Sequence, residues 1–294
     1  MKKKMKGLLM GTACMLALAG CGGSGGAAGN KTELPAEEYV QKAHAMLEEA
    51  DSFAADFFAA VDMGGNNETK TEGTVVLIKE PLMAQVHMKM DFDNALRKST
   101  SEESIYLEEV DGVVSQYMNY DGQWTEMTME KDSALTMVQI YNTLYNMETV
   151  FTAAENWSTE QNGGEIILSG VIPEEKFYDV EEYTRWFQLI GMSGLSEVYY
   201  AGVGDVPVTV TLDAKSGAPR SYSIDLAHAL ETVTNNVLKE LSGGESGDGI
   251  AVKEYQITSV LTAIGGVELD SLSDFVKKDA VNYEEEFSQM AEEE

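Results

Sequence analysis

The sequence of 294 residues has few cysteines, few histidines and little positive charge. Its two cysteines cannot build a disulfide framework, and His44, His87 and His228 are too scattered for a zinc motif. Only 20 Lys and Arg stand against 50 Asp and Glu, which gives a formal net charge of −30. Because such a surface repels phosphate backbones, we expect no binding to nucleic acid.

Motifs of common catalytic sites are also missing. The sequence has no nucleophile elbow between a strand and a helix, no calcium-loop pattern and no phosphate-binding glycine loop. His87 is close to Met88 and Met90, but in a strand it lies on the opposite face from both, which disfavours a copper site. Acidic pairs such as Glu108 and Glu109 are typical of a solvated face in so acidic a chain. We therefore expect no catalytic residue, no metal and no cofactor, and the protein is predicted not to be an enzyme.

The amino terminus carries the most specific pattern in the chain. Four lysines within the first six residues precede an apolar stretch from Gly7 to Ala19. That stretch has the length of a signal-peptide core and is too short for a comfortable membrane span of roughly twenty residues. Leu18, Ala19, Gly20 and Cys21 resemble the lipobox of bacterial lipoproteins, in which the cysteine receives a diacylglycerol and becomes the first residue.

Cleavage before Cys21 makes residues 1–20 a signal peptide and residues 21–34 a lipidated, glycine-rich, flexible tether. Loss of four lysines lowers the formal charge to −34, and loss of Cys14 leaves no free thiol. No second stretch approaches the length of a membrane span, so acyl chains are predicted to anchor an extracytoplasmic protein to the cell membrane. The alternative is an ordinary secreted or membrane-anchored protein in which the position of Cys21 is accidental.

A single domain is expected over 35–287, followed by a frayed acidic tail at 288–294. Apolar spacing predicts a helix over 36–50, and from Ser52 the period changes to two, which favours a strand over a continued helix. The following pattern is of strands joined by short turns, including the Asp111-Gly112 and Asp121-Gly122 hairpin signals. The expected strands are 73–79, 82–92, 104–110, 113–120 and 123–129.

The second half of the chain adds helices and further hairpins. The expected elements are a single helix over 133–154, a hairpin around 162–164, an aromatic-faced helix from 173 to 191, a hairpin of 206–212 with a strand ending at 226, a strand region at 250–264 and a short helix near 273–281. Because strands follow one another through short turns instead of crossover helices, the fold class is predicted to be α+β with an antiparallel sheet.

Several features then stand together: the lipobox and tether, the helix leading into the Ser52 strand, the Lys79-Glu80-Pro81 turn, the Asp-Gly meander with Trp124, and the turn from Asp213 to Pro219. This combination resembles lipoproteins of the LolA/LppX-like class, of the Gram-positive (Firmicutes) type. The resemblance is one of pattern over most of the mature chain, without a short diagnostic motif. It implies an unclosed antiparallel half-barrel with helices packed on its concave face and acyl chains held between them.

These observations predict a membrane-anchored lipoprotein, monomeric and non-catalytic, that binds a lipid or other hydrophobic ligand in a half-barrel cavity. Methionine adapts to variable apolar partners, and twelve methionines survive in the mature chain. The expected cavity residues are Val86, Met88, Met90, Met118 and Met127 on strands and Tyr183, Trp186 and Phe187 on a helix. In the alternative interpretation these side chains are ordinary core, and the protein is an anchored acidic interaction or structural protein of the envelope with no cavity ligand.

Overall fold

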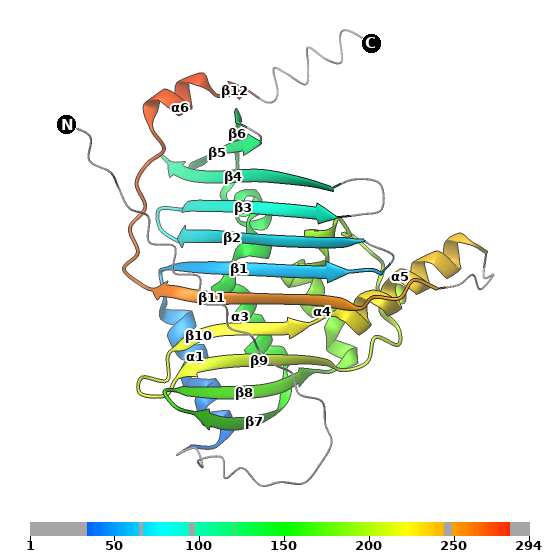
Figure 1. Cartoon of the computed structure of the whole chain (residues 1–294). Helices are drawn as coiled ribbons and strands as arrows, with labels where there is room; N and C mark the ends of the chain where they lie inside the picture. Colours follow the sequence, from blue (N-terminus) through cyan, green and yellow to red (C-terminus); the bar gives the residue numbers. More distant parts are fainter. Residues whose placement is uncertain (1–33, 65–66, 94–97, 121, 244–248, 283–294) are drawn as a thin grey trace.

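One sheet of twelve strands organises the molecule, as seen in a computed structural model that describes residues 34–64, 67–93, 98–120, 122–243 and 249–282 (Figure 1). The strand order is β12-β6-β5-β4-β3-β2-β1-β11-β10-β9-β8-β7. All neighbours are antiparallel except β12 (Val281–Asn282), which runs parallel to β6 (Gln123–Met129). Since β12 and β7 (Glu155–Asn162) end the order without pairing to each other, the sheet is not closed.

The first half of the sheet is the predicted meander. Its strands are β1 (Ser52–Asp62), β2 (Glu68–Ile78), β3 (Met83–Asp93), β4 (Lys98–Val110), β5 (Val113–Tyr120) and β6. The expected change to a period of two at Ser52 is confirmed, because Phe53, Ala55 and Phe57 are buried on one face of β1. β2 and β4 begin earlier than predicted, since their polar first residues are held by ladder hydrogen bonds to β1 and β3 rather than by apolar alternation.

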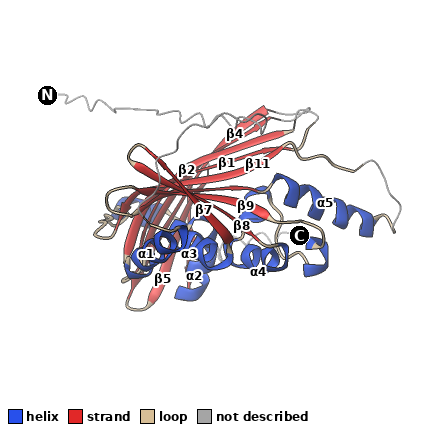
Figure 2. Cartoon of the chain, turned by 90° about the horizontal axis from the view of Figure 1, so that it is seen from below, coloured by secondary structure: helices blue, strands red, loops and turns tan. Residues whose placement is uncertain are grey.

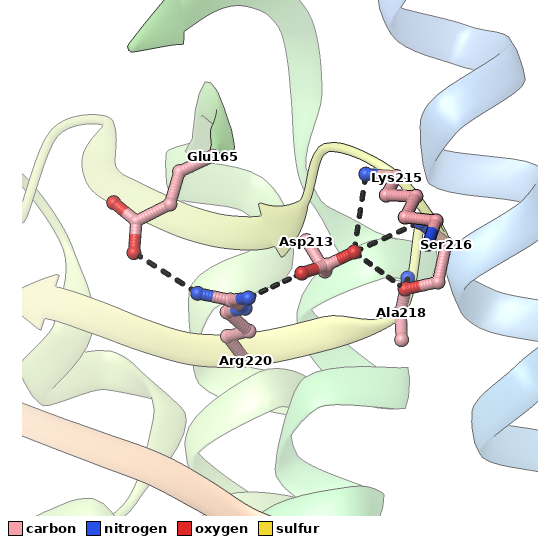
Figure 3. Close-up of polar contacts among 6 residues, drawn as sticks. All are labelled: Glu165, Asp213, Lys215, Ser216, Ala218 and Arg220. Carbon is pink, nitrogen blue, oxygen red and sulfur yellow. Dashed lines mark hydrogen bonds and ion pairs between the residues drawn. The ribbon is translucent and has the colours of Figure 1, made fainter. Parts of the chain in front are cut away.

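The second half consists of β7, β8 (Glu165–Ile172), β9 (Val206–Asp213) and β10 (Pro219–Asp225), paired in sequence order. The β9–β10 turn is organised by Asp213, whose carboxylate accepts the backbone N–H groups of Lys215 and Ser216 and contacts Arg220 (Figure 3). β11 (Glu254–Ile264) then lies between β1 and β10 and joins the two halves.

The region expected to be a single helix over 133–154 is three short elements, so that prediction was wrong. They are α2 (Lys131–Met137), η1 (Gln139–Tyr141) and α3 (Thr143–Ala153). The segment lacks Gly and Pro, but Asn142 leaves the helical conformation and its side chain accepts the Tyr145 N–H at 3.2 Å. An asparagine that caps a new helix in this way competes with continuation of the old one.

The aromatic helix is also divided, into α4 (Glu174–Thr184) and η2 (Trp186–Ile190), because Arg185 adopts the left-handed conformation between them. The prediction omitted α5 (Ala227–Leu241), although Ala229, Leu230 and Val233 carry the helical spacing that marks it. The structure confirms the leading helix as α1 (Ala36–Glu49) and the short late helix as α6 (Asp274–Asp279). A further short turn is η3 (Glu197–Tyr200).

The helices α1 to α4 gather on one face of the sheet, as Figure 2 shows. This layer contacts β5 through α2 and contacts β7 and β10 through α1, so it touches both flanks of the sheet. The sheet therefore curves around the helices, and the covered face is the concave one. The predicted α+β fold, an unclosed half-barrel with helices on its concave face, is confirmed. Among the described helices, none has the length and hydropathy required to cross a membrane.

Candidate ligand site on the concave face

The strand residues predicted to line a cavity all lie on the concave face. Val86 and Met88 of β3 occupy the buried positions of that strand, and Met90 follows with the same period of two. Val86 is level with Ile105 of β4 and then with Met118 of β5, while Met127 of β6 is level with Gln116. Five residues separated by up to 41 positions in the sequence thus share one curved surface.

Burial along that surface falls steadily toward one end. On β3, Ala84, Val86 and Met88 are buried, whereas Met90 and Phe92 are half-buried. The same change occurs on β4, where Leu107 and Ile105 are buried but Glu103 and Ser101 are partly exposed. It occurs again on β5, where Gln116 is buried, Met118 is half-buried and Tyr120 is 56% exposed. We call the residues at this end the open end of the concave face: Met90, Phe92, Ser101, Glu103, Met118 and Tyr120.

Tyr141 of η1 marks the boundary between the covered surface and the open end. Its ring lies against Phe57 of β1, with centroids 5.1 Å apart, and its hydroxyl donates to the Met88 sulfur at 3.3 Å. Burial raises the pKa of the Tyr141 hydroxyl, so it stays a neutral donor at ordinary pH. Met88 is thereby covered by protein, while Met90, two residues further along β3, is not buried.

Glu103 is the one charged residue of the open end. It lies directly across from Met88 on one side and from Tyr120 on the other, and burial raises the pKa of its carboxyl. No hydrogen bond or ion pair connects the Glu103 side chain to another residue in the described part of the chain. A partly desolvated, unpaired carboxyl beside methionine and tyrosine can accept a hydrogen bond from the polar end of a mainly apolar molecule.

Trp186 and Phe187 do not lie at the open end. Both side chains are buried in the core, where Phe187 stacks on Tyr200 at 6.1 Å between centroids and also contacts Phe177 and Tyr255. The Trp186 carbonyl accepts the hydroxyl of Tyr255. The space between η2 and the sheet is therefore filled by an aromatic cluster.

Tyr183 lies in yet another place. It is 58% exposed and lines a hollow of about 520 Å³ between α3 and α4, together with Tyr145, Thr149 and Val180. None of the strand residues of the predicted cavity lines that hollow. Of the eight predicted residues, only Met90, Met118 and Met127 thus remain half-buried on the concave face, with Met118 level with Val86 and Met90 four positions further along β3.

Several buried polar residues were not predicted. The hydroxyls of Thr143 in α3 and Ser259 in β11 are 2.7 Å apart and link the helix layer to the centre of the sheet. Asn146 is fully buried and donates to the Ile140 carbonyl at 3.1 Å, while the amide of buried Gln116 has no hydrogen-bond partner in the described structure. Since Thr143 and Ser259 are 116 positions apart, no local pattern could have found their contact.

His87 lies on the face opposite Met88 and Met90, where its Nδ1 is 2.9 Å from the Ser104 hydroxyl. Within the described ranges, no group of three or more His, Cys, Asp or Glu side chains is placed to hold a metal ion. Cys21, the predicted lipidation site, lies outside the described residues together with the signal peptide and most of the tether.

No family model matches the sequence, and no curated protein matches it. Among solved structures, the chain is similar to that of LprF from Mycobacterium bovis, with a TM-score of 0.45 and 11% sequence identity. The similarity covers 81% of this chain and 96% of that one.

Proposed function

We propose that this chain is an extracytoplasmic lipoprotein, anchored by a lipid on Cys21, that binds a lipid or other hydrophobic ligand at the open end of its concave face without catalysing a reaction. The observation that carries the proposal is the burial gradient along β3, β4 and β5. The helix layer covers Val86 and Met88 but leaves Met90 and Met118 partly exposed on an inward-curving sheet. The site is therefore narrower than the sequence alone predicts.

The side chains of the open end suit an alkyl chain. Met90, Phe92 and Met118 present apolar surface whose removal from water is favourable by roughly 25 cal/mol per Å². Methionine has three rotatable bonds and a polarizable sulfur, so two methionines can follow ligands of different length or branching. Glu103, which lies next to this surface, supplies one polar contact that orients the ligand.

The anchor and the charge fit a protein held near a membrane but not embedded in it. The glycine-rich tether of residues 21–34 allows the folded domain to stand away from the membrane surface. A mature charge of −34 repels the domain from anionic headgroups. In such an arrangement the open end stays accessible to molecules that leave or enter the bilayer.

The test is lipid mass spectrometry on the full chain purified from its native membrane. We expect the wild-type protein to carry lipids that organic solvent extracts, in addition to the acyl chains bound covalently to Cys21. The double variant Met90→Gln/Met118→Gln should retain severalfold less, because each amide must be buried beside the ligand. The matched control is Met46→Gln on α1, a 37% exposed methionine of the helix layer that does not belong to the open end. Equal ligand content in the double variant and the control contradicts the proposed site.

A second candidate function has its own support in the aromatic cluster around Phe187, which fills the space beneath η2. In that case the protein is an anchored acidic interaction or structural protein of the cell envelope with a solid interior. The same purification distinguishes the two. Wild-type protein that carries no extra lipid, and whose melting temperature is unchanged by added fatty acid, favours the second candidate.

A further inference from the structure

A separate pocket lies where α4 meets η2. It has a volume of about 270 Å³ and is lined by residues of α4, η2, the loop after η2 and η3, namely Glu181, Glu182, Arg185, Gln188, Met192, Ser193, Gly194 and Tyr200. No residue of the open end lines it, and its lining is mainly polar. This pocket is therefore separate from the proposed lipid site, and its ligand does not depend on the proposed function.

Glu181 is the buried carboxyl of this pocket. Its residue is only 5% exposed, and its Oε1 accepts the Phe187 N–H at 3.0 Å, but its Oε2 has no hydrogen-bond partner in the described structure. Burial raises the pKa of this carboxyl to about 8, even though the N–H groups of Phe187 and Trp186 oppose the shift. A buried polar atom without a partner is costly, and native proteins retain few of them.

Arg185 is the second unusual residue of the pocket. Its backbone has φ 57° and ψ 32°, the left-handed conformation in which glycine is favoured at the end of a helix. Its guanidinium makes no hydrogen bond or ion pair with another described residue. An arginine without a hydrogen-bond partner among the described residues, held in a strained backbone conformation next to a buried carboxyl with one unsatisfied oxygen, is the kind of local cost that functional sites retain.

We propose that this pocket binds a small zwitterion of amino-acid size, with its ammonium group on Glu181 and its anionic group on Arg185. A volume of about 270 Å³ corresponds to roughly nine water molecules, hence to a ligand of about nine non-hydrogen atoms. The ammonium group satisfies Glu181 Oε2, and a guanidinium fork pairs well with a carboxylate. Glu182, Gln188 and Ser193 offer further polar contacts at the rim.

The pairing with Glu181 gives the site a defined pH dependence. The ammonium group requires the ionised carboxylate, so affinity rises with pH and levels off only above the Glu181 pKa of about 8. The other titratable or charged groups around Glu181 are Glu182 and Arg185, Tyr200 of η3 and Tyr255 of β11. Burial raises the pKa of both tyrosines, so they stay neutral across this range.

Calorimetric titration of the purified full chain with the twenty common amino acids, and with ethylamine and propionate, tests the proposal. We expect at least one amino acid to bind with a Kd below about 10 mM, and both single-charge probes to bind at least about tenfold more weakly. Affinity for that amino acid should fall about tenfold from pH 7 to pH 6. If no amino acid binds, or if propionate or ethylamine binds equally well, the proposal is wrong.

Two variants separate ligand binding from folding. Arg185→Gly removes the guanidinium and relieves the left-handed backbone, so the variant should melt at a higher temperature yet bind at least about tenfold more weakly. Glu181→Gln keeps an acceptor for the Phe187 N–H but cannot pair with an ammonium group, so binding should become weak and lose its pH dependence. Glu175→Gln, on an exposed residue of α4 outside the pocket, is the control. If Arg185→Gly binds the amino acid with wild-type affinity, the assignment of this pocket is wrong. The lipid content of the open end is measured separately and does not affect this result.

Discussion

Phe57 and Gly73 face each other across β1 and β2, and the Phe57 ring occupies the space that a side chain on residue 73 requires. A β-carbon at Gly73 would lie 2.5 Å from the ring carbon Cζ of Phe57 and still closer to the His87 carbonyl oxygen of β3. Glycine weakens a strand, so its presence in the middle of the sheet is explained by this close approach. The same ring supports Tyr141, which covers Met88.

Replacing Gly73 by alanine is expected to destabilise the fold by about 1–3 kcal/mol, the usual cost of overpacking a core. Urea unfolding at neutral pH measures the change. The control is Gly164→Ala in the β7–β8 turn, where a β-carbon meets no atom within 4 Å and φ is not positive. Equal free energies of unfolding for the two variants would contradict the steric explanation.

Glu181 should make the stability of the protein depend on pH. Its folded pKa of about 8 lies above the ordinary value of 4.5, so the stabilisation is complete below about pH 4.5 and is lost as pH rises toward 8. Because one pKa unit corresponds to about 1.4 kcal/mol, the loss is on the order of several kcal/mol. Glu181→Gln should remove this decline, so its stability relative to the wild type increases between pH 5 and pH 8. Urea unfolding across this range gives the result, and parallel curves for the two proteins contradict it.

Asp213 should make the protein less stable as the pH falls, which is the opposite of the effect of Glu181. The Ser216 N–H and hydroxyl, with Arg220, hold the pKa of the Asp213 carboxyl at about 2, below its ordinary value of 3.8 (Figure 3). The stabilisation is therefore present above about pH 4 and is lost as pH falls toward 2. Asp213→Asn should be less stable than the wild type at pH 7, with a difference that shrinks toward pH 2. The control is Glu165→Gln, which removes the longer 3.5 Å contact to Arg220 but leaves the turn intact.

The hydroxyls of Thr143 and Ser259 should stabilise the contact between α3 and β11 as a pair. Thr143→Val leaves Ser259 with a long 3.3 Å hydrogen bond to the Asp56 carbonyl, and the expected cost is about 1–3 kcal/mol. The double variant Thr143→Val/Ser259→Ala should cost less than the sum of the single variants, since neither then leaves a partner unpaired. Thermal unfolding of all four proteins gives the coupling. Strict additivity contradicts a direct bond.

The strands were predictable because their signal is local. The alternation of Phe53, Ala55 and Phe57 depends only on which side chains face the core, and the Asp111-Gly112 turn needs only its own two backbone conformations. The breaks at Asn142 and Arg185 escaped prediction because both residues tolerate helices. At Asn142 the backbone leaves the helical conformation and the side chain caps the start of α3, and at Arg185 a left-handed backbone ends α4.

The sequence by itself determined the acidic composition, the lipobox pattern before Cys21 and the placement of Val86, Met88 and Met90 on one face of a strand, since each depends on residue type or on a period of two. Only the tertiary structure decided which of these side chains the helices cover. The position of η1 buries Met88 and leaves Met90 partly exposed, and the folding of η2 onto Tyr200 and Tyr255 places Phe187 in the core. These outcomes depend on contacts between residues far apart in the chain, which no local pattern encodes.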